Sequence, residues 1–99
     1  MSNAKVVLLV RFKSSLSFEE INRVLEERAP EFRALAGLQQ KYYLQDTDTG
    51  EIAGLYLWES KAALASYQQS ELKASIAEAY RVEGAPRIEV YQVIKPLRE

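Results

Sequence analysis

Two strand-like segments joined by a polar turn constrain the fold of this chain more than any other feature. The segments cover residues 38–45 and 52–59, and both are rich in tyrosine and leucine. In the turn at 46–51, Asp and Thr side chains can hydrogen-bond their own backbone, and Gly50 can adopt the positive φ that ends such a turn. The sequence therefore predicts a β-hairpin that carries three of the six tyrosines and the tryptophan.

The register of this hairpin decides which side chains share a face, and the turn allows two registers. In the first, Asp46 pairs with Glu51. Side chains two residues apart on each strand then line one face. The members of that face would be Lys41, Tyr43, Tyr56 and Trp58.

In the second register, Gly50 forms a bulge and Thr47 pairs with Glu51. Tyr42 then replaces Lys41 and Tyr43 beside the two aromatic residues of the second strand. A slip of one residue exchanges the two faces of a strand, so the sequence leaves this choice open.

A strand is expected at residues 5–13, and because both of its faces are apolar it should lie in the centre of a sheet. Ser17 and Glu20 form a capping box that begins a helix. Pro30 lacks a backbone donor and clashes with the preceding turn, so a break or kink is expected near Ala29. The helix should stop at Ala36-Gly37.

A second helical region should begin after Ser60 and restart at Ser70, since serine is a good N-cap residue. Gly84 and Pro86 are expected to close it. The last strand is predicted at residues 87–94, ended by Pro96.

The predicted order β-α-β-β-α-β is that of an α+β, ferredoxin-like domain in which a four-stranded antiparallel sheet carries its helices on one face. The whole chain, residues 1–99, is read as one such domain. The other face would be apolar and bare, and large exposed apolar patches usually mark contacts. We therefore expect a homodimer whose two sheets pack face to face around a two-fold axis.

Composition excludes several classes of function. The net charge is −1 and no basic run is present, which argues against nucleic acid as a partner. The apolar run at 6–10 is too short for a membrane span or a secretion signal. The lack of cysteine fits a protein of the reducing cytoplasm.

The chain also lacks histidine, so the usual ligands for zinc, copper and haem iron are missing and no metal site is expected. Ser-His and Cys-His nucleophile pairs are excluded for the same reason. Proton transfer would have to use Glu, Asp, Lys, Tyr or water.

Two further residues are candidates for ligand contact. Arg11, among apolar neighbours, could anchor an anionic ligand, but it could equally form an ion pair with a glutamate at the dimer interface. Tyr67 could contact a ligand or simply pack its helix against the sheet.

The chain resembles the YdhR-like monooxygenase family of the dimeric α+β barrel superfamily over residues 5–97. Short sequence words carry the likeness: Gly37-Leu38, Lys41-Tyr42-Tyr43, the acidic turn, Gly54-Leu55-Tyr56-Leu57-Trp58-Glu59-Ser60 and Val93-Ile94-Lys95-Pro96-Leu97. The resemblance implies a dimeric barrel and a ligand pocket between sheet and helices. It also implies an aromatic wall at Trp58 and Tyr56. Haem-degrading relatives use a helical histidine, which this chain lacks.

Two classes of function follow from this resemblance. The first is a cofactor-free monooxygenase that acts on a small phenol or enol. Trp58, Tyr56 and Tyr67 would bind the substrate, Arg11 or Lys41 would stabilise its anion, and Lys41 and Tyr43 are the catalytic candidates. The second is a homodimer that binds a small hydrophobic molecule without turnover.

Overall fold

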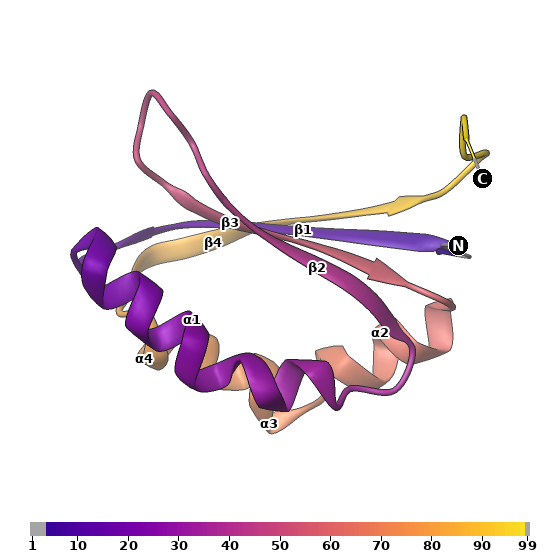
Figure 1. Cartoon of the computed structure of the whole chain (residues 1–99), viewed down its shortest axis with the longest axis horizontal. Coiled ribbons are helices and arrows are strands. Elements are labelled where there is room, and N and C mark those ends of the chain that lie inside the picture. Colours follow the sequence, from indigo (N-terminus) through magenta and orange to yellow (C-terminus); the bar gives the residue numbers. More distant parts are fainter. Residues whose placement is uncertain (1–3, 99) are drawn as a thin grey trace.

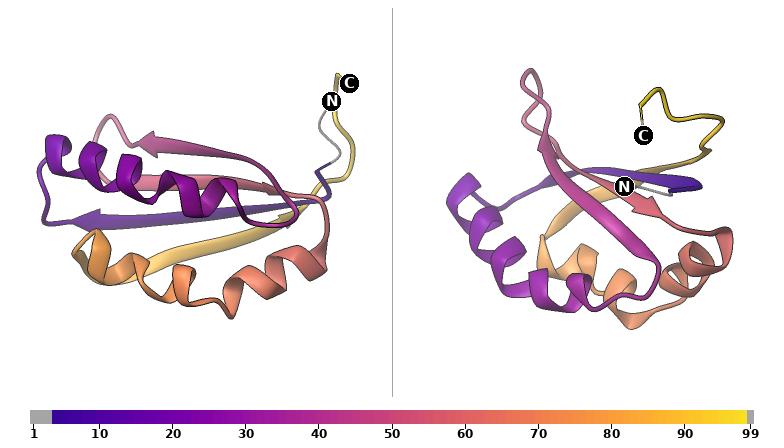
Figure 2. Two further views of the ribbon diagram at one scale, coloured as in Figure 1. Left: turned by 60° about the horizontal axis from the view of Figure 1, so that its bottom comes forward. Right: turned by 45° about the vertical axis from the view of Figure 1, so that its right-hand side comes forward.

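A computed structural model describes residues 4–98 and shows a twisted antiparallel sheet with helices on one face (Figures 1 and 2). The strand order is β2-β3-β1-β4. This is the βαββαβ order of a ferredoxin-like α+β domain, as the sequence predicts. The strands are β1 (Val6–Ser14), β2 (Leu38–Gln45), β3 (Ile52–Trp58) and β4 (Val82–Gln92), and the helices are α1 (Phe18–Arg33), α2 (Lys61–Gln68), α3 (Glu71–Ala74) and α4 (Ile76–Ala79).

The hairpin adopts the first of the two registers. The Asp46 N–H donates to the Glu51 carbonyl over 2.8 Å, and Lys41 lies opposite Tyr56. In the turn, the Asp46 carboxylate accepts backbone N–H bonds from Thr49 and Asp48, which lower its pKa to about 2. The lysine and its neighbours on alternate positions therefore face the helices.

Helix α1 starts with the expected capping box between Ser17 and Glu20. Of the two effects expected of Pro30, a break or a kink near Ala29, the break does not occur. The helix runs unbroken through Pro30 to Arg33 and ends before Ala36. Because Pro30 has no N–H, the helix lacks one hydrogen bond, the one to the carbonyl of the residue four positions earlier. That residue, Glu26, is exposed like Pro30 itself, so water can solvate the freed carbonyl.

Gly37 joins α1 to β2 at a point where the chain passes close to α2. Its φ is +82°, a conformation that favours glycine. A Cβ added there would overlap the Cβ of Ala63 and approach the Glu59 side chain. The glycine thus permits both the turn and the close packing of α2 beside it.

The second helical region is three short helices, and Ser60 and Ser70 cap two of them as expected. The prediction that Gly84 and Pro86 close this region is wrong, because both lie within β4, which begins at Val82. Since β4 is an edge strand, a proline without an N–H is tolerated there. Its pairing with β1 shifts between Arg11 and Lys13, which accommodates the extra residues.

The two faces of the sheet differ in what covers them. On the helix side the core contains fully or nearly fully buried large residues: Val6, Leu8, Phe12, Tyr56 and Trp58 from the sheet, and Ile21, Phe32, Leu64, Tyr67 and Tyr80 from the helical side. The opposite side carries no helix (Figure 1). None of the helices within residues 4–98 is long and apolar enough to cross a membrane.

Replacement of Gly37 tests the close approach to α2. Gly37→Ala should lower the free energy of unfolding by about 2 to 5 kcal/mol, because a left-handed alanine costs about 1–2 kcal/mol and overpacking adds about 1–3 kcal/mol. Gly50→Ala is the matched control, since Gly50 has a φ of +77° but no atom within 4 Å of an added Cβ. It should show the backbone cost alone in urea denaturation.

A second change separates the two effects at position 37. Adding Ala63→Gly to Gly37→Ala should recover stability, although Ala63→Gly alone weakens α2 by about 1 kcal/mol. Equal losses for Gly37→Ala and Gly50→Ala would show that the contact with α2 carries no energy.

Candidate functional site

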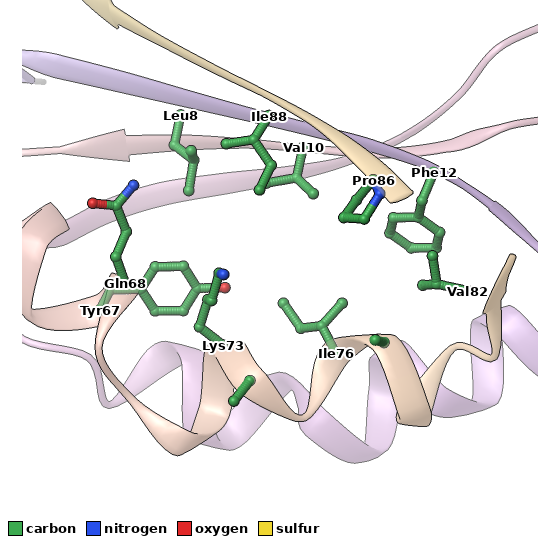
Figure 3. Close-up of a pocket in the computed structure, with 12 residues that line it drawn as sticks. Leu8, Val10, Phe12, Tyr67, Gln68, Lys73, Ile76, Val82, Pro86 and Ile88 are labelled. Atoms are coloured by element: carbon green, nitrogen blue, oxygen red, sulfur yellow. The ribbon is translucent and has the colours of Figure 1, made fainter. Parts of the chain in front are cut away.

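A cavity of about 190 Å³ lies between the sheet and the short helices α2–α4 (Figure 3). An engineered cavity of about 150 Å³ is known to hold benzene, so this space fits one aromatic ring with substituents. Most of its wall is apolar and comes from β1, α4 and β4: Leu8, Val10, Phe12, Ile76, Val82, Pro86 and Ile88. Ile88 is 44% exposed and lies on the edge strand, so the cavity opens there.

Three polar side chains, those of Tyr67, Gln68 and Lys73, meet the cavity at one end (Figure 3). Ser70 fixes the turn that brings them together. Its N–H donates to the Tyr67 carbonyl over 2.9 Å, and its Oγ accepts the Lys73 N–H over 3.2 Å. Residues six positions apart in the sequence therefore lie on the same cavity wall.

Two of the core tyrosines are joined by a hydrogen bond from the Tyr67 hydroxyl to the Tyr56 hydroxyl, 3.3 Å long. Burial raises the pKa of both phenols, so both are neutral at ordinary pH. The Trp58 ring stacks parallel to Tyr56 at 6.2 Å and lies 5.2 Å from Tyr67. Trp58 is 0% exposed and does not line the cavity. Its role is therefore to pack against the rings of Tyr56 and Tyr67.

Lys41 extends from β2 into a cage of three aromatic rings. Its Nζ lies 3.5 Å from the ring centre of Phe32, 4.4 Å from that of Tyr56 and 4.5 Å from that of Tyr43. Among residues 4–98, Nζ has no carboxylate or hydrogen-bond acceptor as a partner. The amine is thus held by ring faces alone.

Burial, and to a smaller extent the nearby Arg28 cation, lowers the pKa of Lys41 from its ordinary 10.5 to about 7. The ring faces favour the charged form, but the loss of hydration opposes it more strongly. A lysine with such a pKa exists partly as the neutral amine near pH 7. It can therefore accept a proton, as a general base must.

Arg28 was not among the residues that the sequence singled out. It lies on the inward stripe of α1, seven residues after Ile21 and four before Phe32, and that spacing is the signal that could have revealed it. Its Nη2 donates to the Leu72 carbonyl over 3.1 Å and to the Ser75 Oγ over 3.0 Å. The arginine thereby fixes α3 against α1 and places a cation near Lys41.

A small void of about 20 Å³ lies next to the cage, and both Lys41 and Tyr56 line it. Its wall shares Val10, Phe12 and Ile76 with the larger cavity. A void of this size has room for one water molecule. The cage and the cavity are therefore neighbours in the space between sheet and helices.

Arg11 lies on the opposite face of the sheet, and the structure does not bring it to the cavity. Its guanidinium forms ion pairs with Asp46 and, at 2.9 Å, with Glu51. Glu51 and Asp46 raise the pKa of Arg11 through these bonds. The arginine joins the hairpin turn to β1.

The structure therefore brings together three of the tyrosine and lysine candidates, namely Lys41, Tyr43 and Tyr56, and connects them to Tyr67. Lys73 and Gln68 are cavity residues that sequence reasoning missed, and no pattern in the sequence marks them. Within the part of the chain that the structure describes, no group of three or more acidic side chains is placed to hold a metal ion.

Comparison with known proteins identifies the family and the fold. The model of the family described as "Putative mono-oxygenase ydhR" matches residues 7–99. A comparison with curated protein sequences found no significant match.

Three solved structures illustrate the likeness in fold. SnoaB from Streptomyces nogalater, a cofactor-independent oxygenase, is 17% identical with a TM-score of 0.76, over 97% of this chain and 99% of that one. A monooxygenase from the gene ActVA-Orf6 of Streptomyces coelicolor, in complex with Nanaomycin D, is 18% identical with a TM-score of 0.73, over 98% and 94%. A protein from Caulobacter crescentus described as a putative antibiotic biosynthesis monooxygenase is 18% identical with a TM-score of 0.76, over 93% and 92%.

The lowered pKa of Lys41 predicts how stability depends on pH. Between pH 7 and 10.5 the unfolded chain, with an ordinary lysine, binds more protons than the folded chain, so the free energy of unfolding should rise with pH. A pKa difference of one unit corresponds to about 1.4 kcal/mol, so wild type should gain about 2 kcal/mol from pH 7 to pH 9 relative to Lys41→Met.

Urea denaturation at several pH values measures this difference. The chain has no histidine or cysteine to titrate in that range, which simplifies the comparison. Lys61→Met, at an exposed lysine, is the control and should follow wild type. Parallel pH profiles for wild type and Lys41→Met would mean that Lys41 is an ordinary lysine.

Proposed function

Because the chain belongs to the ydhR mono-oxygenase family, we propose that it is a cofactor-independent monooxygenase that oxidises a small phenol or enol. The substrate occupies the cavity between the sheet and α2–α4. The observation that carries the proposal is Lys41, caged against the ring face of Tyr56, whose hydroxyl accepts a hydrogen bond from Tyr67 on the cavity wall. The likeness to SnoaB supports the fold that this chemistry would use.

The reaction needs an electron-rich ring and no metal. Loss of a proton from the phenol or enol gives an anion that can donate one electron to dioxygen. The resulting radical and superoxide combine to a peroxide anion at a ring carbon, and the proton removed in the first step returns to give the hydroperoxide. In a substrate such as an anthrone, where that carbon is a CH₂ group, loss of water leaves a carbonyl, so that one oxygen atom enters the product and the other leaves as water.

The chain's own residues supply the base. Tyr67 lines the cavity, and its oxygen can accept the substrate's proton as its own hydroxyl donates to Tyr56. A water in the 20 Å³ void can pass the proton from Tyr56 to the neutral amine of Lys41. The apolar walls exclude bulk water and so protect the radical pair.

Oxygen consumption in metal-free buffer tests this proposal directly. With dithranol, an anthrone, or with a dihydroxynaphthalene as substrate, the wild-type protein should consume one dioxygen per product molecule. Lys41→Met should lower kcat by about 100-fold or more, since a general base contributes about 10²–10⁴. Lys61→Met, which removes the same charge at an exposed site, should leave kcat unchanged.

The pH dependence gives a second readout for the same variants. The wild-type kcat should rise with pH around 7, as Lys41 loses its proton, and Lys41→Met should lose this step. Binding of these compounds without any oxygen consumption would instead favour the second class, a dimer that holds a small molecule without turnover.

We also propose that the helix-free face of the sheet pairs with a second copy. Apolar side chains from all four strands cover this face, and several are strongly exposed in the single chain, among them Tyr91 at 52%, Tyr42 at 50% and Leu44 at 43%. The registers place them beside Leu9, Leu55 and Leu57. Two such faces packed together would close a barrel.

A charge placed in the middle of this face should separate the copies. Leu55→Glu should convert a wild-type dimer to a monomer in native mass spectrometry, because an unpaired carboxylate in an apolar interface is strongly unfavourable. Val90→Glu is the matched control, since Val90 is 51% exposed on the other face of the sheet and should leave the dimer intact. A monomeric wild-type protein would contradict the proposed pairing.

A further inference from the structure

The charges around the 190 Å³ cavity are of one sign. Lys73 points into it from α3 (Figure 3). Lys41 lies in the adjoining aromatic cage, with Arg28 nearby. No aspartate or glutamate of the described chain lines either the cavity or the small void. A ligand that balances this charge must bring a negative group of its own.

Lys73 is available for that group. Within residues 4–98 the Lys73 ammonium forms no ion pair, although the protein has several exposed glutamates that could serve as partners. Its backbone N–H is fixed by the Ser70 cap, so the side chain starts from a defined point on the cavity wall. Helix α1 also holds this part of α3 in place, because Arg28 of α1 donates to the carbonyl of Leu72, the residue before Lys73.

The polar groups of the cavity are gathered rather than scattered. Tyr67, Gln68 and Lys73 lie at one end, while Phe12, Val82 and Pro86 lie at the other (Figure 3). The aromatic ring of a ligand would fit the apolar end. An oxygen substituent of that ring would then meet the hydroxyl of Tyr67, the amide of Gln68 and the ammonium group of Lys73. Donors aimed at one point stabilise an anion there more strongly than water-exposed donors do.

We propose that the cavity is a binding site for an aromatic anion, whose carboxylate or ionised hydroxyl lies against Lys73 with Gln68 and Tyr67 beside it. Lys73 is thus the residue that selects charged over neutral aromatic ligands. This inference names the substrate class of the monooxygenase proposed above and rests on that proposal for its link to catalysis. The binding itself does not depend on turnover.

Two probes of the same shape test the charge preference without any oxidation. The probes are 2-naphthoate, an anion at pH 7.5, and 2-naphthamide, its neutral counterpart, and calorimetry at low salt measures the binding of both. The wild-type protein should bind the naphthoate at least about tenfold more tightly, a difference of about 1.4 kcal/mol. Lys73→Gln should remove this preference while still binding the amide.

Lys61→Gln is the matched control, because it removes the same charge from an exposed lysine that does not line this cavity. It should keep the tenfold preference. Methyl NMR locates the ligand: the signals of Ile76 and Ile88 should shift on binding, whereas that of Ile94, which is 99% exposed, should not.

Three results would overturn the inference. The first is equal affinity for the two probes in the wild-type protein. The second is an equal loss of preference in Lys73→Gln and Lys61→Gln, which would reduce the effect to overall charge. The third is no binding of either probe at millimolar concentration. Charge-selective binding without oxygen consumption would support this inference and contradict the monooxygenase proposal. Oxygen consumption without charge-selective binding would support the monooxygenase proposal and contradict this inference.

Discussion

The pairing of Asp46 with Glu51 is the interaction on which the candidate site depends. It sets the hairpin register, and a shift of one residue would turn Lys41 and Tyr43 to the opposite face and bring Tyr42 in. Arg11 holds the same turn from the other side of the sheet by pairing with both carboxylates. A surface ion pair of this kind adds little stability by itself. Its consequence is positional, because it keeps a lysine under the helices rather than in solvent.

The sequence predicted the elements better than it predicted their ends. Strand order, caps and the hairpin follow from local rules, because Ser17, Ser60 and Gly50 each satisfy a backbone need that neighbouring residues define. The exceptions depend on tertiary position. Pro30 was expected to break or kink α1, but the helix continues through it, and Glu26, whose carbonyl loses its partner, is an exposed residue. Gly84 and Pro86 were expected to close the second helical region, yet both lie in β4, where an edge strand tolerates a proline without an N–H.

The site was predictable in part for the same reason. Alternation along a strand placed Lys41 and Tyr56 on one face once the register was known, and the periodicity of α1 would have added Arg28. The cavity wall at Lys73 could not be foreseen, because it is formed by three short helices that follow one another along the sheet, two of them capped by Ser60 and Ser70 (Figure 1). Their direction depends on long-range contacts such as that of Arg28 with α3. Arg11 was ambiguous from sequence, since either face of β1 is apolar.

Lys41 is difficult to explain as a structural residue. A buried ammonium without a carboxylate partner is unfavourable, and a methionine of similar shape would pack against the same three rings without that cost. The rings of Phe32 and Tyr56 compensate only part of the lost hydration. A lysine in this setting has one property that methionine lacks, a proton that it can accept near neutral pH. Ionisable groups with perturbed pKa values gather at functional sites, so the cage is better explained by a role in proton transfer than by a role in packing. Arg28 strengthens this reading, because a second cation placed near the first lowers stability further and only makes the amine a readier proton acceptor.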